Sequence, residues 1–338
     1  MSTPLLTVAV PTYNGEKTIR QMLDILLLQC DERVEVLVSD NASTDTTAAI
    51  LAEYTAQYPQ IRLVRNEQNI GPDANFLQCM RLASGKYTLL LSDDDVLMEN
   101  KLARVLDFLE NSPKLSLVYL NAKAFFDVYT NESDCRFCDN AVYDGKIFST
   151  ADKKLFMDYA KRMWGFLSCF ICLTEAFQSI AEPEQYFGTN WLQSYIHILC
   201  ADYGDKQLGV FGEPCIGAGV YAIINNFDAA RVDGVEYRKM LDFAIAHGFD
   251  KPQLDAFFQW RFCFLLRRTI IKERAAGIHR SDFKAAARLM WRYPYAWIVL
   301  YPFFLIPPFA CRWIVRWNNK RKGRTEMPTL NRQGDISK

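Results

Sequence analysis

The sequence has no excess of charge of either sign, no basic stretch at residues 1–14 and no visible internal repeat. Its 338 residues include 39 Lys and Arg against 39 Asp and Glu. No global field therefore favours nucleic acid, and we expect no nucleic-acid partner. The first residues have no basic stretch and too short an apolar run for a signal peptide, so we expect a cytoplasmic protein. The chain is long enough to bury a sizeable core, as one large domain with an appendage or as two domains.

The ten cysteines do not indicate a disulfide framework, because no secretory context accompanies them. Two pairs, Cys135/Cys138 and Cys169/Cys172, have the Cys-x-x-Cys spacing of a zinc site. Cys169 and Cys172, however, lie in the apolar run 166–173, where cysteine is typical of a small core residue. A four-thiolate zinc site and ordinary core packing are therefore the two interpretations, and the composition favours the second.

Apolar strands and amphipathic helical patterns alternate along the first 120 residues. Strands are expected at 7–11, 34–38, 61–64, 87–91 and 115–119. This alternation predicts an α/β fold with a mainly parallel sheet that is covered by helices on both faces. Polar residues follow the strands, and open sheets of this kind bind ligands beyond the carboxyl ends of their strands.

The most unusual chemistry is the aspartate run, Asp93, Asp94 and Asp95, which directly follows the apolar strand beginning at Tyr87. Adjacent acids repel one another, and burial against an apolar strand costs still more free energy. A divalent cation would relieve both costs, and all-oxygen ligands suit Mg²⁺ or Mn²⁺. The alternative interpretation is a solvated acidic turn.

The later part of the chain changes character twice. Residues 121–225 read as short strands and loops rich in aromatic residues, and residues 226–290 return to helical periodicity. Residues 295–315 are long enough to cross a bilayer, but three prolines and one arginine argue against a single straight span. Their aromatic side chains and the basic cluster at 320–324 favour an interfacial or re-entrant segment at the cytoplasmic leaflet. A kinked pair of core helices is the alternative.

Four motifs occur in order within residues 5–100: Val8-Ala-Val-Pro-Thr-Tyr-Asn-Gly15, Val38-Ser-Asp-Asn-Ala-Ser-Thr-Asp45, Asn69-Ile-Gly71 with Asn75, and Leu91-Ser-Asp-Asp-Asp95. As a set they resemble those of a family 2 glycosyltransferase of the GT-A fold, a Rossmann-like nucleotide-binding sheet with helices on both faces. The Ser-Asp-Asp variant and the later Gly-Thr-x-Trp are similar to bacterial enzymes of O-antigen and capsule assembly, such as abequosyltransferase-like proteins.

The resemblance implies a nucleotide-sugar site at the ends of the first strands. The nucleobase pocket would be lined by Pro11, Thr12 and Tyr13. The Tyr13 ring would lie against the base, and Asp40 would accept a hydrogen bond from it, most simply from the N3–H of a uracil. Asn69 and Asn75 match family positions that shape the sugar-phosphate pocket.

The aspartate run falls on the metal-binding motif of this family. The resemblance implies that Asp93 lies near the ribose and that Asp94 binds Mg²⁺ or Mn²⁺, with Asp95 as a supporting ligand. Ser92 stands where many members carry the first aspartate of the motif. The metal would therefore be held by fewer carboxylates than in those members.

The general base is the second departure from the family pattern. Many members carry an acid before a tryptophan on the acceptor side of the cleft, and the equivalent pair here is Asn190 and Trp191. An amide cannot take a proton, so another group must act as the base. Candidates close in sequence are Glu182, Glu184 and His197, each of which could equally have an ordinary surface or core role.

The implied reaction is inverting transfer of a sugar from a UDP-linked donor to a hydroxyl of a lipid-linked glycan in bacterial surface polysaccharide synthesis. The acceptor would be carried on a polyprenyl diphosphate at the cytoplasmic face of the inner membrane. Two alternatives stay open. A non-catalytic nucleotide-sugar-binding scaffold is compatible with Asn190, and a nucleotidyltransferase would need a Gly-rich basic loop that residues 12–17 only weakly provide.

The expected domain organisation follows from these patterns. A GT-A domain is predicted at 1–225, with a nucleotide-sugar half at 1–120 and an acceptor half at 121–225. A helical region is expected at 226–290, a membrane-associating segment at 291–325 and a disordered tail at 326–338.

Overall fold

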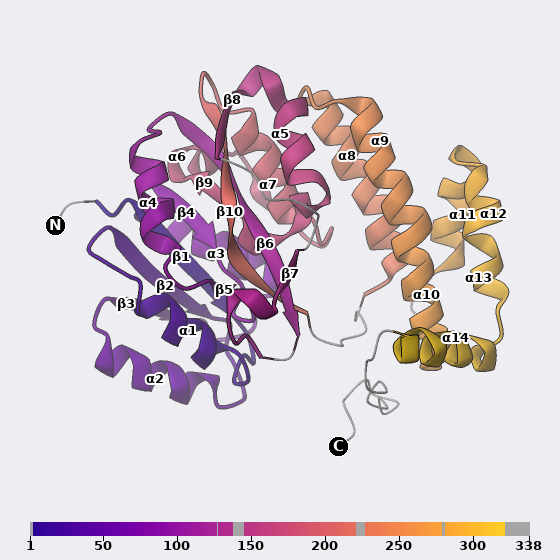
Figure 1. The fold of residues 1–338 in the computed structure, drawn as a ribbon, viewed down its shortest axis with the longest axis horizontal. Coiled ribbons are helices and arrows are strands. Elements are labelled where there is room, and N and C mark those ends of the chain that lie inside the picture. The colour runs from indigo at the N-terminus through magenta and orange to yellow at the C-terminus, as the bar shows by residue number, and fades with distance from the viewer. Residues whose placement is uncertain (1–2, 127, 138–144, 221–226, 279–280, 322–338) are drawn as a thin grey trace. The chain divides into compact units, whose positions relative to one another are not determined.

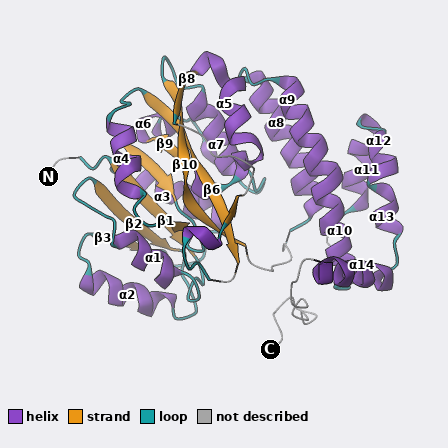
Figure 2. Cartoon of the chain, in the orientation of Figure 1, coloured by secondary structure: helices purple, strands orange, loops and turns teal. Residues whose placement is uncertain are grey.

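The computed structural model describes residues 3–126, 128–137, 145–220, 227–278 and 281–321. The chain divides into two compact units, residues 1–221 with 246–250, and residues 222–245 with 251–338. The first unit is built on a β-sheet and the second from helices (Figures 1 and 2). The predicted boundary at 225 and the predicted tail at 326–338 lie outside the described residues.

The described strands of the first unit form one mixed sheet in the order β3-β2-β1-β4-β9-β6-β10-β5, with β7 paired to β6 and β8 to β10. Their bounds are β1 Leu6–Thr12, β2 Val34–Asp40, β3 Ile61–Arg65, β4 Tyr87–Leu90, β5 Val96–Leu97, β6 Leu115–Phe126, β7 Arg136–Phe137, β8 Lys146–Ser149, β9 Phe170–Leu173 and β10 Gln207–Val220. β1 to β4 pair in parallel, as the alternation predicts. β9 is inserted antiparallel between β4 and β6, which the alternation does not predict.

Helices α1 (Ile19–Leu27), α2 (Thr47–Gln57) and α3 (Pro72–Leu82) connect the first four strands. The sheet grows from β1 through β2 to β3, and β4 then returns to the other side of β1. Because crossovers between parallel strands are right-handed, α3 covers the face opposite to α1 and α2. The reversal creates a topological switch point between the carboxyl ends of β1 and β4, where open α/β sheets bind ligands.

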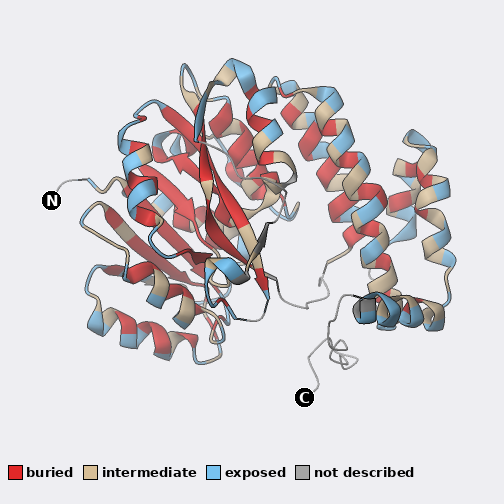
Figure 3. Cartoon of the chain, viewed as in Figure 1, coloured by how far each residue is buried: buried red, intermediate tan, exposed pale blue. Residues whose placement is uncertain are grey.

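The parallel strands form the core of this unit, and their interiors are coloured as buried in Figure 3. Every residue of β1 and of β4 is buried, as expected for strands that are covered on both faces. The remaining helices of the unit are α4 Leu102–Glu110, α5 Lys153–Ala160, α6 Thr174–Gln178 and α7 Leu192–Ala201. Helix α6 packs between α3 and α7.

The C-terminal part of the chain is helical throughout its described residues. Its helices are α8 Tyr237–Ala246, α9 Lys251–Trp260, α10 Leu266–Ala275, α11 Phe283–Arg292, α12 Tyr295–Val299, α13 Tyr301–Leu305 and α14 Pro308–Arg321. The predicted aromatic segment is thus divided among three helices, because prolines interrupt it. Within the part of the chain that the structure describes, no helix combines the length and hydropathy needed to cross a bilayer.

Candidate active site

β1 and β4 end side by side, and the side chains beyond them meet at the switch point. Thr12 donates its hydroxyl hydrogen to Asp93 Oδ2. Gly15 passes so close that a Cβ at this position would overlap the Asp93 carboxylate. Burial is the main reason that the pKa of Asp93 rises to about 7; the Thr12 hydrogen bond opposes this rise, and the charge of Asp94 adds to it. Asp93 is therefore a carboxylate whose charge is stabilised when a cation lies nearby.

Asp94 is half-buried beside Asp93. Ser92 donates its hydroxyl hydrogen to Asp94 Oδ1 at 2.5 Å, and Oδ2 makes no hydrogen bond with a described residue. Among the described residues, no group of three or more His, Cys, Asp or Glu side chains is arranged to hold a metal ion. Mg²⁺ is commonly held by one or two carboxylates together with substrate phosphates. Asp93 and Asp94 fit a cation whose coordination a diphosphate would complete.

Asp95 has a different role from its two neighbours. Its carboxylate is buried, Oδ2 accepts a hydrogen bond from Ser168 Oγ at 2.6 Å, and Oδ1 accepts one from Gly219 N at 2.9 Å. Burial and the charge of Asp94 raise the pKa of Asp95 to about 8. The geometry does not support the prediction of Asp95 as a metal ligand, because both oxygens are engaged in joining the aspartate run to the segment before β9 and to β10.

A second carboxylate at this edge belongs to Asp40, the last residue of β2. Its side chain is buried, and Oδ1 accepts a hydrogen bond from Ser43 N at 2.9 Å. Oδ2 lies 3.3 Å from Arg65 Nε but has no hydrogen-bond partner among the described residues. Arg65 is therefore the ionic partner of this oxygen, but a buried acceptor that lacks a hydrogen bond is still costly. An N–H group of a ligand would satisfy it.

Tyr13 lies next to Asp40 in the register of the sheet, since Thr12 pairs with Asp40. The Tyr13 side chain is 46% exposed, whereas Pro11 and Thr12 are buried beneath it. Two loops meet here, because Asn14 N donates to Ser43 Oγ at 2.9 Å and Thr44 N donates to Asn14 Oδ1 at 2.8 Å. The loops after β1 and β2 therefore hold an accessible aromatic ring beside a buried carboxylate.

Asn69 and Asn75 belong to a network of amide side chains behind this pocket. Asn69 Oδ1 accepts hydrogen bonds from Asn41 Nδ2 at 2.9 Å and from Gly71 N at 2.8 Å. Asn75 is buried and exchanges hydrogen bonds with the side chain and carbonyl of Ser39. Both predicted residues hold the loop 66–71 against the end of β2. Sequence reasoning missed Asn41 as the partner of Asn69, although Asn41 directly follows Asp40.

The opposite wall is formed by residues 165–168 and 188–191. Gly165 lies against the Trp191 ring so closely that a Cβ there would overlap it, and Trp191 is buried. Ser168 Oγ accepts a hydrogen bond from Ser92 N at 3.0 Å, which brings this wall to the aspartate run. Asn190 is exposed, with φ of 63°. Trp191 therefore supports the segment 165–168, which is bonded to the aspartate run, and Asn190 is exposed.

Glu184 is exposed and forms an ion pair with Arg81 at 2.5 Å. Arg81 lies in the last turn of α3, whereas Asp73 in its first turn accepts a hydrogen bond from Gly188 N at 2.7 Å. The two positions are about 12 Å apart along the helix axis. The segment 184–188 thus runs from the far end of α3 towards the cleft. The geometry does not support Glu184 as the base. Glu182 is exposed, with φ of 50°, and stays a prediction.

His197 is a core residue. Its Nδ1 lies 3.3 Å from the carbonyl oxygen of Trp164, and its ring centroid lies 4.4 Å from that of Phe170. Burial lowers the pKa of His197 to about 3, although the bond to Trp164 acts in the opposite direction. A neutral imidazole enclosed by aromatic rings cannot reach a substrate, so His197 is not the base.

The second of the two cysteine pairs lies in the core. Cys169, just before β9, and Cys172, within it, are both buried, as expected for core residues. Cys138 lies outside the described residues, so the four-thiolate arrangement falls partly outside them as well.

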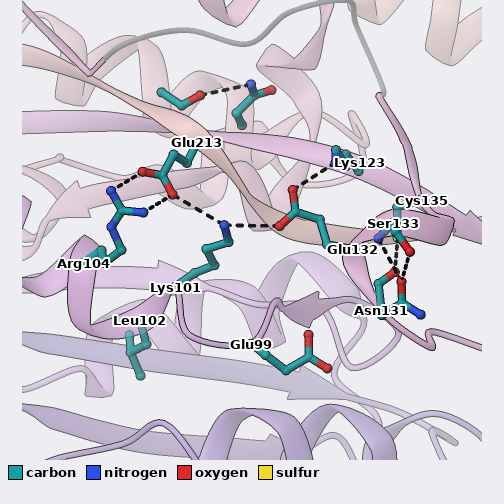
Figure 4. Close-up of polar contacts among 12 residues, drawn as sticks. Glu99, Lys101, Leu102, Arg104, Lys123, Asn131, Glu132, Ser133, Cys135 and Glu213 are labelled. Atoms are coloured by element: carbon teal, nitrogen blue, oxygen red, sulfur yellow. Dashed lines mark hydrogen bonds and ion pairs between the residues drawn. The ribbon is translucent and has the colours of Figure 1, made fainter.

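The segment that follows the aspartate run is fixed by ion pairs (Figure 4). Lys101 Nζ lies 3.2 Å from Glu132 Oε2 and 3.4 Å from Glu213 Oε2. Glu132 also pairs with Lys123 at 2.9 Å, and Glu213 pairs with Arg104. These contacts join α4, β6 and β10 behind the aspartate run.

Comparison with known proteins bears on the family and the fold. Residues 7–172 match the family described as Glycosyl transferase family 2. Abequosyltransferase RfbV of Salmonella typhimurium is 26% identical over 219 residues, 62% of each chain. The uncharacterized protein Rv1520 of Mycobacterium tuberculosis is 34% identical over 126 residues, 36% of each chain. The match thus spans about a third of the length of that relative.

Solved structures resemble nearly the whole chain. S. aureus TarS 1-349, in complex with UDP, has a TM-score of 0.58 at 16% identity, and the match covers 98% of each chain. A mannosyltransferase from Pyrobaculum calidifontis, in complex with GDP-Man and Mn²⁺, has a TM-score of 0.50 over 94% of this chain and 88% of that one. The likeness to TarS confirms the expected GT-A fold.

The buried imidazole makes stability depend on pH. The folded pKa of His197 is about 3, below the ordinary 6.5, so the unfolded chain binds a proton that the folded chain rejects. Stability is complete above pH 6.5 and falls as the pH drops towards 3. At pH 5 the loss should be about 2 kcal/mol. Denaturant unfolding measures the loss of stability between pH 7 and pH 5. This loss should be about 2 kcal/mol smaller for His197→Gln than for the unaltered chain. An unchanged loss contradicts the assignment, and His247→Gln controls for the removal of a histidine.

Proposed function

Residues 7–172 belong to glycosyl transferase family 2, and on this premise we propose that the chain transfers a sugar from a UDP-linked donor to a hydroxyl of a lipid-linked glycan. The observation that carries the proposal is the pairing of two features at one sheet edge. Asp40 Oδ2 is a buried acceptor without a hydrogen-bond partner among the described residues, and Asp93 and Asp94 stand at the switch point. The UDP complex of the similar TarS supports the choice of nucleotide.

The nucleotide half of the donor has a role for each predicted residue. Asp40 accepts the N3–H of the uracil in a charge-assisted hydrogen bond. Tyr13, whose ring is accessible, stacks on the base. Asn69 and Asn75 act indirectly, because they hold the loop beside the base. Arg65 is half exposed, pairs with Asp40 and donates a hydrogen bond to the Ser43 carbonyl at 3.1 Å, so the proposal requires it to turn away from Asp40 when the base enters.

The diphosphate half of the donor faces the aspartate run. Asp93 lies near the ribose, and Asp94 is the carboxylate that would hold Mg²⁺ or Mn²⁺. The ion, when bound, supplies positive charge against the diphosphate as the glycosidic bond breaks. Ser92 orients Asp94 through its hydroxyl, so a serine at the first position of the motif keeps a function there.

The transfer itself is an in-line displacement with inversion. The acceptor hydroxyl attacks the anomeric carbon from the face opposite to the diphosphate, and UDP departs with the electron pair of the broken bond. No covalent sugar intermediate forms. A base on the acceptor wall must take the hydroxyl proton.

Two other functions predict different products. A non-catalytic scaffold would bind a nucleotide sugar and release nothing, and a nucleotidyltransferase would release pyrophosphate. Release of UDP separates glycosyl transfer from both.

The full chain with Mn²⁺ should release UDP from at least one member of a panel of UDP-glucose, UDP-galactose and UDP-N-acetylglucosamine, with water as the acceptor. Asp94→Ala should lower this rate about 100-fold, since the stabilisation of the leaving charge is worth several kcal/mol. Glu53→Ala, which removes an exposed acid on α2, is the matched control. Equal rates for Asp94→Ala and the unaltered chain in coupled UDP detection would rule out this role for Asp94.

The acceptor side of the proposal concerns the C-terminal helices. Six large apolar side chains there are at least half exposed: Trp291, Ile298, Leu305, Phe309, Trp313 and Trp317. Phe309, Trp313 and Trp317 recur every four residues on α14 and so share one face. Arg312 and Arg316 are exposed on the same helix. Aromatic side chains with basic neighbours suit the headgroup region of an anionic membrane.

This arrangement supports peripheral attachment to the cytoplasmic face of the inner membrane. There the enzyme would meet a glycan carried on a polyprenyl diphosphate. The basic cluster at 320–324, which is mostly outside the described residues, would add to the attraction at about 1 kcal/mol per residue.

The full chain should sediment with vesicles of phosphatidylglycerol and phosphatidylcholine more strongly than with phosphatidylcholine alone. Replacing Trp313 and Trp317 together by serine should weaken this binding at least about tenfold, because two aromatic anchors are lost. Leu28→Ser, which removes an exposed apolar side chain at the end of α1, should change nothing. Equal sedimentation of the double variant would refute attachment through α14.

A further inference from the structure

The proposed function leaves one chemical task unassigned, and this inference rests on that function. An acceptor hydroxyl must lose its proton as it attacks, and Asn190 cannot receive it. Glu184 is paired with Arg81 at the far end of α3, and His197 is enclosed in the core. The base has to be sought among the other acids that face the acceptor wall.

Asp73 is such an acid. It lies in the first turn of α3 and is half-buried. Its Oδ2 accepts a hydrogen bond from Gly188 N at 2.7 Å, and Gly188 precedes Asn190 by two residues. Asp73 Oδ1 makes no hydrogen bond with a described residue. The contact fixes the carboxylate in one orientation and leaves one oxygen able to accept a proton.

Hydrogen bonds tie the start of α3 to the end of β2 on one side and to the segment 188–191 on the other. Two residues before Asp73, the carbonyl of Gly71 accepts a hydrogen bond from Asn41 Nδ2 at 3.2 Å, which ties the start of α3 to the nucleobase end of β2. On the other side, Gly188 leads to Trp191, whose ring lies on Gly165. That wall continues to Ser168 and the aspartate run. The start of α3 thus lies between the nucleotide pocket and the acceptor wall.

We propose that Asp73 is the general base of the transfer, and that it replaces the acid which family members carry at the position of Asn190. Burial raises the pKa of Asp73, against the lowering effect of the Gly188 hydrogen bond, and a less acidic carboxyl is a better proton acceptor near neutral pH. In sequence the two positions are far apart, but the Gly188 contact brings both to the same wall.

The step balances as follows. The acceptor O–H bond breaks and its proton moves to Asp73 Oδ1, while the oxygen forms a bond to the anomeric carbon. The bond between that carbon and the diphosphate oxygen breaks, and UDP leaves with the electron pair. The carboxyl group then returns its proton to solvent.

Asp73→Asn tests this role with little structural change, because the amide oxygen can still accept the Gly188 hydrogen bond. For UDP release from the same panel of UDP sugars, we expect kcat to fall about 100-fold or more, with the KM of the donor and the affinity for UDP unchanged. Arg81→Gln is the matched control, since it breaks a different contact between α3 and residues 184–188, the ion pair with Glu184. It should keep the kcat of the unaltered chain.

Four results would overturn the inference. Retention of kcat by Asp73→Asn would exclude proton transfer to this residue. A higher KM with unchanged kcat would make Asp73 a contact for the donor sugar instead, and a parallel loss of UDP affinity and melting temperature would make its role structural. If the unaltered chain releases no UDP from any donor, the proposed function fails, and the inference fails with it.

Discussion

Three adjacent carboxylates at the end of a buried strand are the constraint on which this structure depends. Each of them has its own hydroxyl donor: Asp93 from Thr12, Asp94 from Ser92, and Asp95 from Ser168. The donors come from different parts of the sheet, so the repulsion among the acids is offset by bonds that also join β1, β4 and the segment before β9. Without a cation, hydrogen bonds of this kind and a raised pKa are the available ways to keep such a cluster buried.

The same constraint organises the cleft. Thr12 donates a hydrogen bond to Asp93 and pairs with Asp40 in the sheet, so it links the end of β1 to both acids. Ser168, in the segment before β9, is hydrogen-bonded to both Ser92 and Asp95 and so joins that segment to the aspartate run. Two of the three acids thereby remain available to a ligand, whereas Asp95 is committed to the fold. Asp95 differs from its two neighbours because both of its oxygens accept hydrogen bonds from described protein donors.

Short sequence patterns predicted those parts of the fold that depend on residues close together in the chain. The parallel half of the sheet, the turn residues and the residues that gather at its edge follow from strand periodicity and a set of short motifs. The antiparallel insertion of β9 could not be predicted, since it depends on pairing with β4 and β6 across long stretches of chain. The contacts of Asp95 and Glu184 could not be predicted for the same reason. Their partners, Ser168 and Arg81, lie 73 and 103 residues away, and no local spacing reveals such contacts.

The central claim is that a uracil nucleotide binds at the end of β2 through Asp40. Calorimetric titration of UDP in the presence of Mn²⁺ tests it most directly, with Asp40→Ala compared against Glu35→Ala. Glu35 is an acid at the other end of the same strand, bonded to Thr7 and Ser84, so it controls for the loss of a bonded carboxylate from β2. The account predicts that Asp40→Ala weakens UDP binding by about 10- to 100-fold, the value of a hydrogen bond to a charged group, and that Glu35→Ala leaves it unchanged. Equal UDP affinity in Asp40→Ala and the unaltered chain would contradict the account.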